Sequence, residues 1–582
     1  MPRARLPRTT LLFLLAIPAC GGAGEPATSA GTGTGTGGDR SIPPDASASA
    51  MSSSGEGGAG GASSSASSGS GGSGGEPSGS CIMAGDAGLA KSKWVYVDAS
   101  GKLAYKTLPK GERILDFSRS GYQGGGVAIP TVPVAKTVNP SGGDDTAAIQ
   151  AAIDAVSALP ASNGLRGAVL LGPGTFKVKS TLSITTSGVV LRGSGSGAMG
   201  TVLVLSGAPR AAISIQGTGS WKTVGAGATL TDAYVPSGAT SFQVDSATGL
   251  QIGDHVLIDR TVTDAWIHFM GMDKLVRNGK PETWISAGSV IHTDRVITAI
   301  TGNQVTVDAP LSDSYDAQYT LPGVKITPYT FDGRIEQVGL EAMRLIAPTA
   351  SVPISDPLFA ILDMNAVIDG WVKDVVGEEF TSGFSLGATT KRITVADAAF
   401  DRVTAIDGSA GYPFSYSVAG QQTLVMRSST HADKVYSYAT MARVSGPNVL
   451  LDFKGTGNWT RIETHQRWAT GLLLDGVDSP GGSINLIDRG YLGTGHGWTI
   501  GFAVAWNGVA MDLTVQQPPG AQNWAIGTSG ALKQQAEAGN ADPTPMPSGI
   551  TESIGKAVAP RSLYLAQLCE RLGPQALANI GY

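Results

Sequence analysis

The chain has 582 residues, a formal net charge of -5 and a pI near 5.7. This length allows a large core and more than one module, and the acidic balance excludes the basic face of a typical nucleic-acid-binding protein. Glycine contributes 81 residues while only 15% of residues are charged, which indicates many tight turns.

Residues 1–20 read as an export signal. Three arginines precede an apolar run, Leu11–Ile17, which is too short to span a bilayer as a mature helix. Residues 17–20 read Ile-Pro-Ala-Cys, which resembles a bacterial lipobox and makes Cys20 the expected site of lipidation. An ordinary signal peptide with an incidental cysteine is the alternative. We therefore expect an exported protein that is anchored to the outer membrane or cell surface through Cys20, and that is otherwise secreted.

A low-complexity segment follows at residues 21–80. It consists almost entirely of Gly, Ser, Ala and Thr, so it cannot bury enough apolar surface to fold. We expect a disordered linker that holds the folded part away from the membrane. No later segment is apolar enough to cross a bilayer.

The stretch 141–197 predicts one helix followed by very short strands. Ile149, Ile153 and Val156 fall three and four residues apart, which places them on one face of a helix. Short apolar runs follow, each cut off by Gly, Pro, Ser or Thr, and predict strands at 168–171, 175–178, 181–184 and 189–192. A helix that covers the open end of a stack of such strands indicates a capped solenoid.

This stretch resembles the opening motif of pectate-lyase-like right-handed parallel β-helix proteins of the rhamnogalacturonase and epimerase type. In that family a DD-T-AIQ-AID helix precedes a PPGTY-like turn and a V-LRG-G strand. The matching residues are Asp144, Asp145, Thr146, Ile149, Gln150, Ala152, Ile153, Pro173, Gly174, Thr175, Phe176, Leu191, Arg192 and Gly193. The resemblance implies an all-β fold, a right-handed parallel β-helix with an N-terminal capping helix. It implies much less about chemistry, because function depends on the site and not on the fold.

Further modules surround this motif. Alternating strands joined by Gly-Asp and Gly-Asn turns interrupt the coils and predict a small inserted antiparallel β module. An amphipathic helix near the C-terminus is expected to dock on the solenoid, and a Pro-Pro-Gly loop at 518–520 either walls a groove or closes the last coil. In chain order, after the signal and the linker, we expect an N-terminal module (81–135), the first coils (136–220), the inserted module (221–330), the main β-helix (331–530) and a C-terminal tail with a helix (531–582).

Three cysteines occur, at positions 20, 81 and 569. If Cys20 is lipidated, the other two form an even pair in an oxidising compartment, so a disulfide between them is allowed. We do not expect it, because the two ends of a solenoid are normally far apart. Cys569 is instead expected to face a core.

The densest polar cluster covers residues 458–468, and a second polar segment, 488–498, follows about one coil later. Stacked coils place residues one repeat apart above one another, at roughly 4.8 Å per layer. We therefore expect a catalytic centre formed by His465, Arg467, Arg489 and His496. The residues expected to contact the substrate are Trp468, Trp498, Lys454, Glu463 and Asp488, together with Trp266 and His268 of the inserted module.

Such a cluster suits β-elimination from a uronic-acid polymer. The reaction needs a cation on the carboxylate, a base for the adjacent proton and an acid for the leaving oxygen. Arginine binds both carboxylate oxygens, and histidine acts as acid or base near neutral pH. The prediction is a polysaccharide lyase in which the two histidines transfer protons and the two arginines bind the carboxylate.

Three alternatives stay open. A glycoside hydrolase needs two carboxylates, for which the candidates are Glu463, Asp475, Asp488, Glu378 and Glu379. A surface adhesin would use the same cluster to bind an acidic glycan without catalysis. The cluster also has a purely structural explanation, in which His and Arg bond backbone carbonyls in turns and Trp fills loop cores. Trp266, likewise, suits the core of a small barrel as well as a sugar-stacking wall.

We expect a monomer whose partner is an extracellular polysaccharide and not a nucleic acid. No cofactor is assigned, although Ca²⁺ stays open because some lyases of this fold bind it through carboxylates. Five carboxylates that are close in sequence are Asp363, Asp369, Asp374, Glu378 and Glu379.

Overall fold

A computed structural model describes residues 81, 85–277, 279–533 and 546–582. The expected export signal, the linker and Cys20 lie outside the described residues. Among the helices in the described ranges, none is long and apolar enough to cross a membrane.

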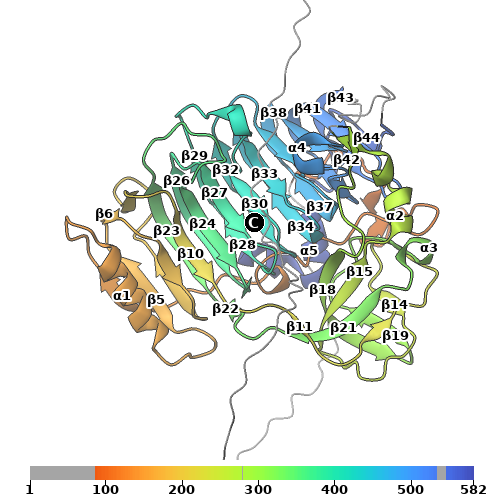
Figure 1. Cartoon of the computed structure of the whole chain (residues 1–582), viewed down its shortest axis with the longest axis horizontal. Helices are drawn as coiled ribbons and strands as arrows, with labels where there is room; N and C mark the ends of the chain where they lie inside the picture. Colours follow the sequence, from red (N-terminus) through yellow and green to blue (C-terminus); the bar gives the residue numbers. More distant parts are fainter. Residues whose placement is uncertain (1–80, 82–84, 278, 534–545) are drawn as a thin grey trace, which may run out of the picture. The chain divides into compact units, whose positions relative to one another are not determined.

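Most of the fold is one sheet of 28 strands wound into coils, whose parallel strands stack in three faces (Figure 1). This is the right-handed parallel β-helix that the sequence predicts. Face A stacks β4 (Val134–Val138), β5 (Gly167–Leu171), β8 (Val189–Arg192), the first halves of β23 (Gly339–Ile346) and β26 (Trp371–Glu378), β28 (Thr394–Ala396), β31 (Leu424–Met426), the ends of β34 (Ser445–Leu451) and β37 (Ala469–Asp475), β40 (Val504–Trp506), β42 (Trp524–Ile526) and β44 (Ile550–Glu552).

The other two faces use the same coils. Face B stacks β6 (Gly174–Val178), β9 (Thr201–Leu205), the ends of β23 and β26, β29 (Ala399–Asp401), β32 (Ser429–His431), β35 (Lys454–Thr456) and the starts of β38 (Asp478–Leu486) and β41 (Val509–Val515). Face C stacks β7 (Leu182–Ile184), β10 (Ala211–Gln216), β24 (Ala360–Asn365), β27 (Ser382–Leu386), β30 (Tyr416–Val418), β33 (Tyr436–Thr440), β36 (Arg461–Glu463), the ends of β38 and β41, and β43 (Ser529–Lys533).

A sharp corner joins face A to face B in successive coils. The corner residue has a left-handed backbone, as at Asp397 (φ 56), Asp452 (φ 47) and Asn507 (φ 49). Its N–H donates to the next coil, for example from Asp397 to the Met426 carbonyl at 3.1 Å. L-residues avoid this region at a penalty of roughly 1–2 kcal/mol each. The hydrogen bonds between coils therefore hold a conformation that the local sequence disfavours.

The helix α1 (Thr146–Ser157) covers one end of the stack (Figure 1). Ile149, Ile153 and Val156 are buried and belong to the same core as the inward side chains of the coils. Their spacing in the sequence predicts this stripe, and the strands that follow α1 lie within a residue or two of the predicted ones.

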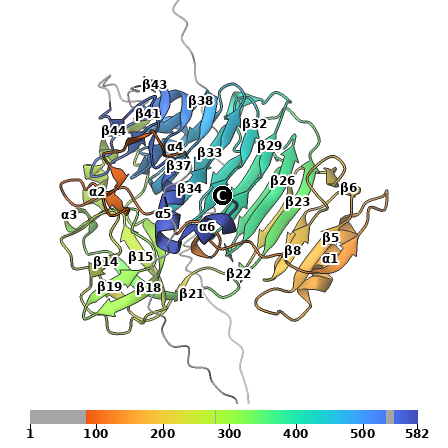
Figure 2. The ribbon, with the colours of Figure 1, turned by 180° about the vertical axis from the view of Figure 1, so that it is seen from behind.

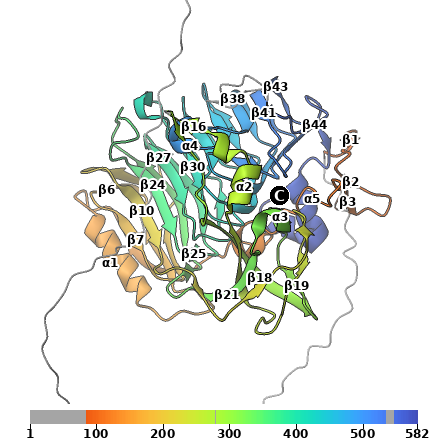
Figure 3. The same cartoon turned by 45° about the vertical axis from the view of Figure 1, so that its right-hand side comes forward.

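The inserted module lies between β10 and β23. Its antiparallel sheet has its own apolar core, and Figure 3 shows the module with its helices beside the coils. Its elements are β11 (Lys222–Thr223), β12 (Ala228–Thr229), β13 (Tyr234–Val235), β14 (Ser241–Gln243), β15 (His255–Thr261), α2 (Asp264–Phe269), η2 (Met272–Lys274), β16 (Val276–Arg277), β17 (Lys280–Pro281), β18 (Val290–Thr301), β19 (Gln304–Val307), β20 (Tyr315–Asp316), α3 (Ala317–Thr320) and β21 (Lys325–Thr330).

A buried ion-pair network fastens this module to the coils. Lys391 Nζ, in the corner before β28, lies 2.6 Å from Asp294 of β18, and Arg334 lies 3.3 Å from the same carboxylate. All three side chains are almost fully buried. The geometry of the interface is therefore specified by charge pairing as well as by apolar contact.

The outer side of face A is apolar and covered. Leu424, Leu451 and Val504 share an apolar cluster with the N-terminal segment and the C-terminal helices, which lie over the strands in Figure 2. The covering elements are β1 (Ala90–Lys91), β2 (Val95–Val97), β3 (Leu103–Tyr105), η1 (Tyr122–Gly124), α5 (Leu563–Leu572) and α6 (Pro574–Asn579). The C-terminal helix thus docks on the solenoid as predicted. The remaining short elements are β22 (Ile335–Glu336), β25 (Val367–Ile368), η3 (Gly408–Ala410), α4 (Leu492–Gly495), β39 (Ile500–Gly501) and β45 (Val558–Ala559).

A disulfide joins Cys81 to Cys569, with Cα atoms 5.7 Å apart, which corrects the expectation that the two cysteines stay separate. Cys81 and Cys569 meet because neither the N-terminal segment nor the C-terminal tail stays at an end of the stack. The C-terminal tail folds back over face A, and the N-terminal segment runs alongside it, with β1 pairing β45 in parallel. Cys569 is also buried in the helix α5, so it lies within the packed interface as well as in the disulfide.

Candidate functional site

Coil stacking brings His465, Arg489 and His496 together, although they are far apart along the chain. β36 and β38 are neighbours on face C, and the segments that follow them carry these residues. The rings of His465 and His496 are 4.6 Å apart between centroids. Arg489 Nη1 lies 3.1 Å from His465 Nδ1 and donates to the His465 carbonyl at 3.0 Å.

A buried carboxylate holds this group together. Glu463 Oε1 lies 3.3 Å from Arg489 Nη1, and Asn485 donates to Glu463 Oε2 at 2.7 Å. The Glu463 side chain has no solvent exposure. A charge pair so enclosed contributes little net stability, but removing either partner leaves an uncompensated buried charge.

The two histidines are enclosed and neutral. His465 is 8% exposed and His496 is 3% exposed. Burial, and then the Arg489 guanidinium, push the pKa of His465 well below its usual range, and the same two causes lower the pKa of His496 to about 3. Neither ring nitrogen of His496 has a hydrogen-bond partner among the described residues. Neither imidazole is among the residues that line the pocket described below.

Arg467 lies against the turn of α4. Its guanidinium donates to the carbonyl and the hydroxyl of Thr494, both at 2.8 Å, and to the Gly495 carbonyl at 3.2 Å. The side chain thus braces the turn of α4, which agrees with the structural alternative for this arginine.

Trp266 and Trp468 lie in the interface between the inserted module and the coils. Each is 2% exposed, and their ring centroids are 5.8 Å apart. The Trp468 indole donates to Asp313 at 3.0 Å, and the Arg260 guanidinium lies 4.2 Å over the Trp266 ring. Neither ring is among the residues that line the pocket described below. Both belong to the apolar cluster of the interface and not to the module's own apolar core.

His268 and Lys454 lie apart from the cluster. His268 is exposed on α2, where its Nδ1 lies 2.6 Å from Asp273 Oδ2. Lys454 begins β35 on face B, in register with Asp478. The expected contact set is therefore divided between different faces of the protein.

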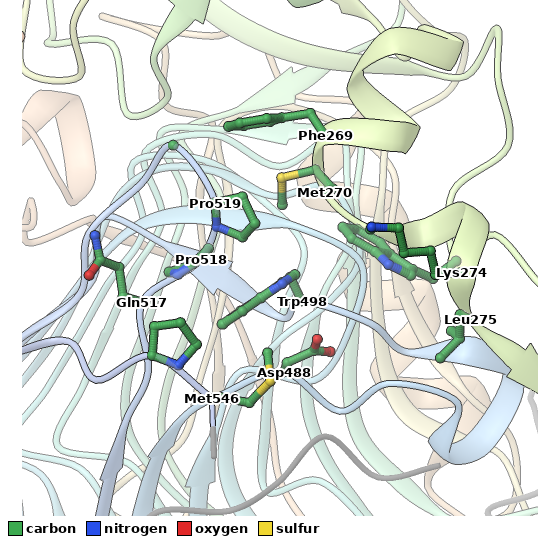
Figure 4. Close-up of a pocket in the computed structure, with 14 residues that line it drawn as sticks. Phe269, Met270, Lys274, Leu275, Asp488, Trp498, Gln517, Pro518, Pro519 and Met546 are labelled. Carbon is green, nitrogen blue, oxygen red and sulfur yellow. The ribbon is translucent and has the colours of Figure 1, made fainter. Parts of the chain in front are cut away.

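One pocket of about 520 Å³ lies beside the cluster, between α2 and η2 of the inserted module and the last coils. We call it the Trp498 pocket, and Figure 4 shows the Trp498 ring in its middle with Asp488 below it. Asp488 Oδ1 accepts from the Gly490 N–H at 2.8 Å, which orients the carboxyl group. The lining residues are Phe269, Met270, Gly271, Lys274, Leu275, Trp284, Asp488, Trp498, Gln517, Pro518, Pro519, Gly520, Met546 and Pro547.

Sequence reasoning finds only part of this pocket. Asp488 and Trp498 belong to the expected contact set, and the Pro518–Gly520 loop walls the pocket, one of the two roles foreseen for it. Lys274 is missed, because nothing in the sequence brings η2 next to a coil that comes more than two hundred residues later. The aromatic residues around Trp266 are the one local signal for that region.

Three of the five carboxylates considered for Ca²⁺ are engaged separately. Asp369 pairs with Arg392 at 2.5 Å, Asp374 accepts from Ser196 at 2.5 Å and Glu378 pairs with Arg344. Within the described ranges, no three His, Cys, Asp or Glu side chains gather as metal ligands.

No known family profile matches the chain, and no curated protein matches it. Similar solved structures include the tailspike protein gp49 from Pseudomonas phage LKA1, with 12% identity, 71% of this chain and 72% of that chain covered, and a TM-score of 0.34. A tailspike mutant of E. coli bacteriophage HK620 in complex with pentasaccharide has 12% identity, coverage of 71% and 57%, and a TM-score of 0.37. The A-module of the Azotobacter vinelandii mannuronan C-5 epimerase AlgE6 has 11% identity, coverage of 76% and 95%, and a TM-score of 0.34. Likeness at this level carries no argument about function, and the fold rests on the strand register described above.

Proposed function

We propose that this protein acts on an extracellular polysaccharide and that the Trp498 pocket holds part of the sugar chain. The pocket volume of about 520 Å³ lies in the range of small-molecule sites. The walls combine the rings of Trp284 and Trp498 with the carboxylate of Asp488 and the ammonium of Lys274. Aromatic faces suit the C–H faces of sugar rings, and the charged groups suit hydroxyls and carboxylates. This combination is the observation that carries the proposal.

Within this function we propose β-elimination from a uronic-acid-containing polymer. Lys274 offers a cation to the uronate carboxylate, and Asp488 offers a base for the adjacent C–H proton. As that proton leaves, the neighbouring C–O bond breaks, a C=C bond forms and the leaving oxygen takes a proton from water. Hydrolysis needs two carboxylates across the bond, and Asp488 is the sole carboxylate among the described residues that line the pocket. The pocket therefore favours a lyase over a hydrolase.

We assign His465 and Arg489 a positioning role in place of direct proton transfer. Arg489 follows Asp488 in the chain and is bonded to His465 and Glu463 of the preceding coil. Those bonds fix the start of the loop that carries the base. Neither histidine is among the residues that line the pocket, which supports this assignment.

The test is an assay for the ultraviolet absorbance of unsaturated products on polygalacturonate and alginate. Asp488→Asn is expected to lower kcat by roughly 10²–10⁴-fold, because an amide cannot accept the proton. His465→Ala should lower kcat less and leave the pH profile of kcat/KM unchanged, as a positioning residue would. Asp332→Asn, an exposed acid far from the pocket in sequence, is the control and should match the wild type.

The other outcomes separate the alternatives. Reducing-sugar release without unsaturated product would replace the lyase with a hydrolase. Saturable glycan binding without any product would leave a non-catalytic adhesin, a function that the enclosure of the histidines also fits. Neither binding nor product on any acidic or neutral glycan would refute the proposed function.

We also propose that the protein is exported and anchored by a lipid on Cys20. The Cys81–Cys569 disulfide supports export, because such bonds persist in oxidising compartments. Cys20→Ser is expected to move the protein from the membrane fraction to the soluble fraction and to abolish labelling by a palmitate analogue. Cys81→Ser, as the matched cysteine control, should remain membrane-bound. Unchanged labelling of Cys20→Ser would exclude the anchor.

A further inference from the structure

A group of aromatic rings surrounds an arginine at the edge of face C where the strands begin. Tyr412 and Trp459 come from neighbouring loops, and their ring centroids are 4.3 Å apart. The Arg461 guanidinium lies 3.8 Å over the Trp459 ring, a distance typical of a cation–π contact. Both rings are partly exposed, so these three residues, which we call the Arg461 patch, meet solvent.

The guanidinium of Arg461 is held in place but weakly neutralised. Its ion pair among the described residues is a 3.4 Å contact to Glu463 Oε2. That oxygen already accepts from Asn485 at 2.7 Å, and the other Glu463 oxygen faces Arg489. One carboxylate is therefore shared between two arginines. The Arg461 side chain remains 29% exposed, and stacking on Trp459 removes much of the rotamer freedom that binding would otherwise have to restrict.

Aromatic contacts connect the patch to the buried histidines. Tyr436 packs against Trp459, with ring centroids 6.4 Å apart, and stacks on Phe414 at 5.0 Å. Phe414 in turn meets the edge of the His465 ring at 4.9 Å. These contacts place a packed layer of aromatic side chains beneath the Arg461 patch. A precise binding site requires such support.

We propose that the Arg461 patch is a second saccharide-binding site, which takes an acidic sugar. The planar guanidinium matches a carboxylate or a sulfate ester in a bidentate manner, and the Tyr412 ring offers a surface to the sugar ring beside it. This inference rests on the proposed function, and it adds a site that does not touch the Trp498 pocket.

The two sites lie at opposite edges of face C. Trp459 precedes β36, whereas Asp488 follows β38, which is the next strand on that face. The length of strand between the two edges of face C is roughly 10 Å, at about 3.3 Å per residue. A short oligosaccharide that fills the pocket therefore leaves the patch empty, while a longer one spans both. Affinity should rise with chain length until the patch is reached.

The experiment measures Kd by calorimetry for oligogalacturonates of increasing length and for dextran sulfate fragments. The Asp488→Asn protein serves as the background, so that the probes stay intact. Arg461→Met is expected to weaken long acidic oligomers about 10-fold, the loss of one charge-assisted contact, and to leave the shortest ones unchanged. The salt dependence of long-oligomer binding should also fall. Tyr412→Ala, from a different loop, should act in the same direction.

Two controls separate the sites. Lys106→Met removes a cation that lies 4.6 Å over Trp94, in the N-terminal segment, and should change nothing. Trp498→Ala should weaken short and long oligomers alike, because it acts in the pocket. Preference for oligogalacturonate over dextran sulfate would identify the bound group as a carboxylate, and the reverse as a sulfate.

The failure of this inference is distinct from the failure of the proposed function. Unchanged Kd values for long oligomers in both Arg461→Met and Tyr412→Ala would overturn the patch and leave the pocket standing. Equal weakening of short and long oligomers by Arg461→Met would also overturn it, since the patch would then not be a separate site. If the protein binds no saccharide at all, both proposals fall.

Discussion

Glu463→Ala is expected to lower the free energy of unfolding by about 3–5 kcal/mol, the usual effect of removing one partner from a buried charge pair. The Glu463 side chain has no solvent exposure and lies against Arg489, which is itself buried. Without the carboxylate, the Arg489 guanidinium keeps its charge but loses its compensating partner, and the Asn485 amide loses an acceptor. Urea denaturation followed by circular dichroism measures the change.

A matched surface pair provides the control. Asp332 forms a 2.9 Å ion pair with Lys222, and both side chains are exposed, so Asp332→Ala should change stability by less than about 1 kcal/mol. The double variant Glu463→Ala, Arg489→Met should recover part of the loss, because no buried charge is then left unpaired. A Glu463→Ala effect as small as that of Asp332→Ala would show that water reaches the cluster, and that the histidines are accessible after all.

Asp475→Asn is expected to remove a fall in stability between pH 4 and pH 7. Asp475 ends β37 and is fully buried against the start of α5, where it accepts from the Ser562 hydroxyl at 2.7 Å and from the Tyr564 N–H at 2.8 Å. Burial raises the pKa of its carboxyl group to about 7, and these hydrogen bonds oppose that shift only in part.

The direction of this change in stability with pH follows from the difference in proton binding between the folded and unfolded states. Between the unfolded pKa near 3.8 and the folded pKa near 7, the folded state holds a proton that the unfolded state releases. The carboxyl group therefore stabilises the fold at low pH, and that contribution is lost as the pH rises through the folded pKa. A difference of about three pKa units corresponds to roughly 4 kcal/mol.

The measurement compares denaturation midpoints of wild type and Asp475→Asn across this range. The difference between the two proteins isolates Asp475 from the other titrating groups. Asp478→Asn, a less buried aspartate that begins β38, is the control and should keep the wild-type slope. A parallel pH dependence in wild type and Asp475→Asn would contradict the raised pKa.

The sequence is sufficient to predict the fold class because two local signals agree. The apolar stripe of α1 and the short strands after it indicate a capped stack by periodicity, independently of the family resemblance. The inserted module is predicted for the same reason, since its alternating strands differ from the coils in pattern. The corners between faces A and B are not predicted. Asp397, Asp452 and Asn507 are of the residue types that tolerate a left-handed backbone, but Arg427 is not, so residue type does not mark every corner. Hydrogen bonds between coils decide those conformations.

The prediction of the candidate site from the sequence is limited in the same way. The one-repeat spacing correctly predicts that His465 lies close to His496. It does not predict which residues bury the two side chains. Burial depends on the α4 turn and on aromatic rings such as Phe414 from other coils. The sequence leaves two roles open for Trp266, a sugar-stacking wall and the core of a small barrel, and the structure places it against a surface far away in the sequence. Both cases concern tertiary cover, which residue type and spacing do not encode.

The Cys81–Cys569 bond also determines how mechanical load enters the protein. Tension applied to the chain ahead of Cys81 is transmitted through the disulfide to α5. The short strands β1 to β3 therefore carry little of it. Helix α5 is in turn anchored to face A by Asp475 and by its apolar side. Force applied at the N-terminus is thus delivered through α5 to the coils on which that helix packs.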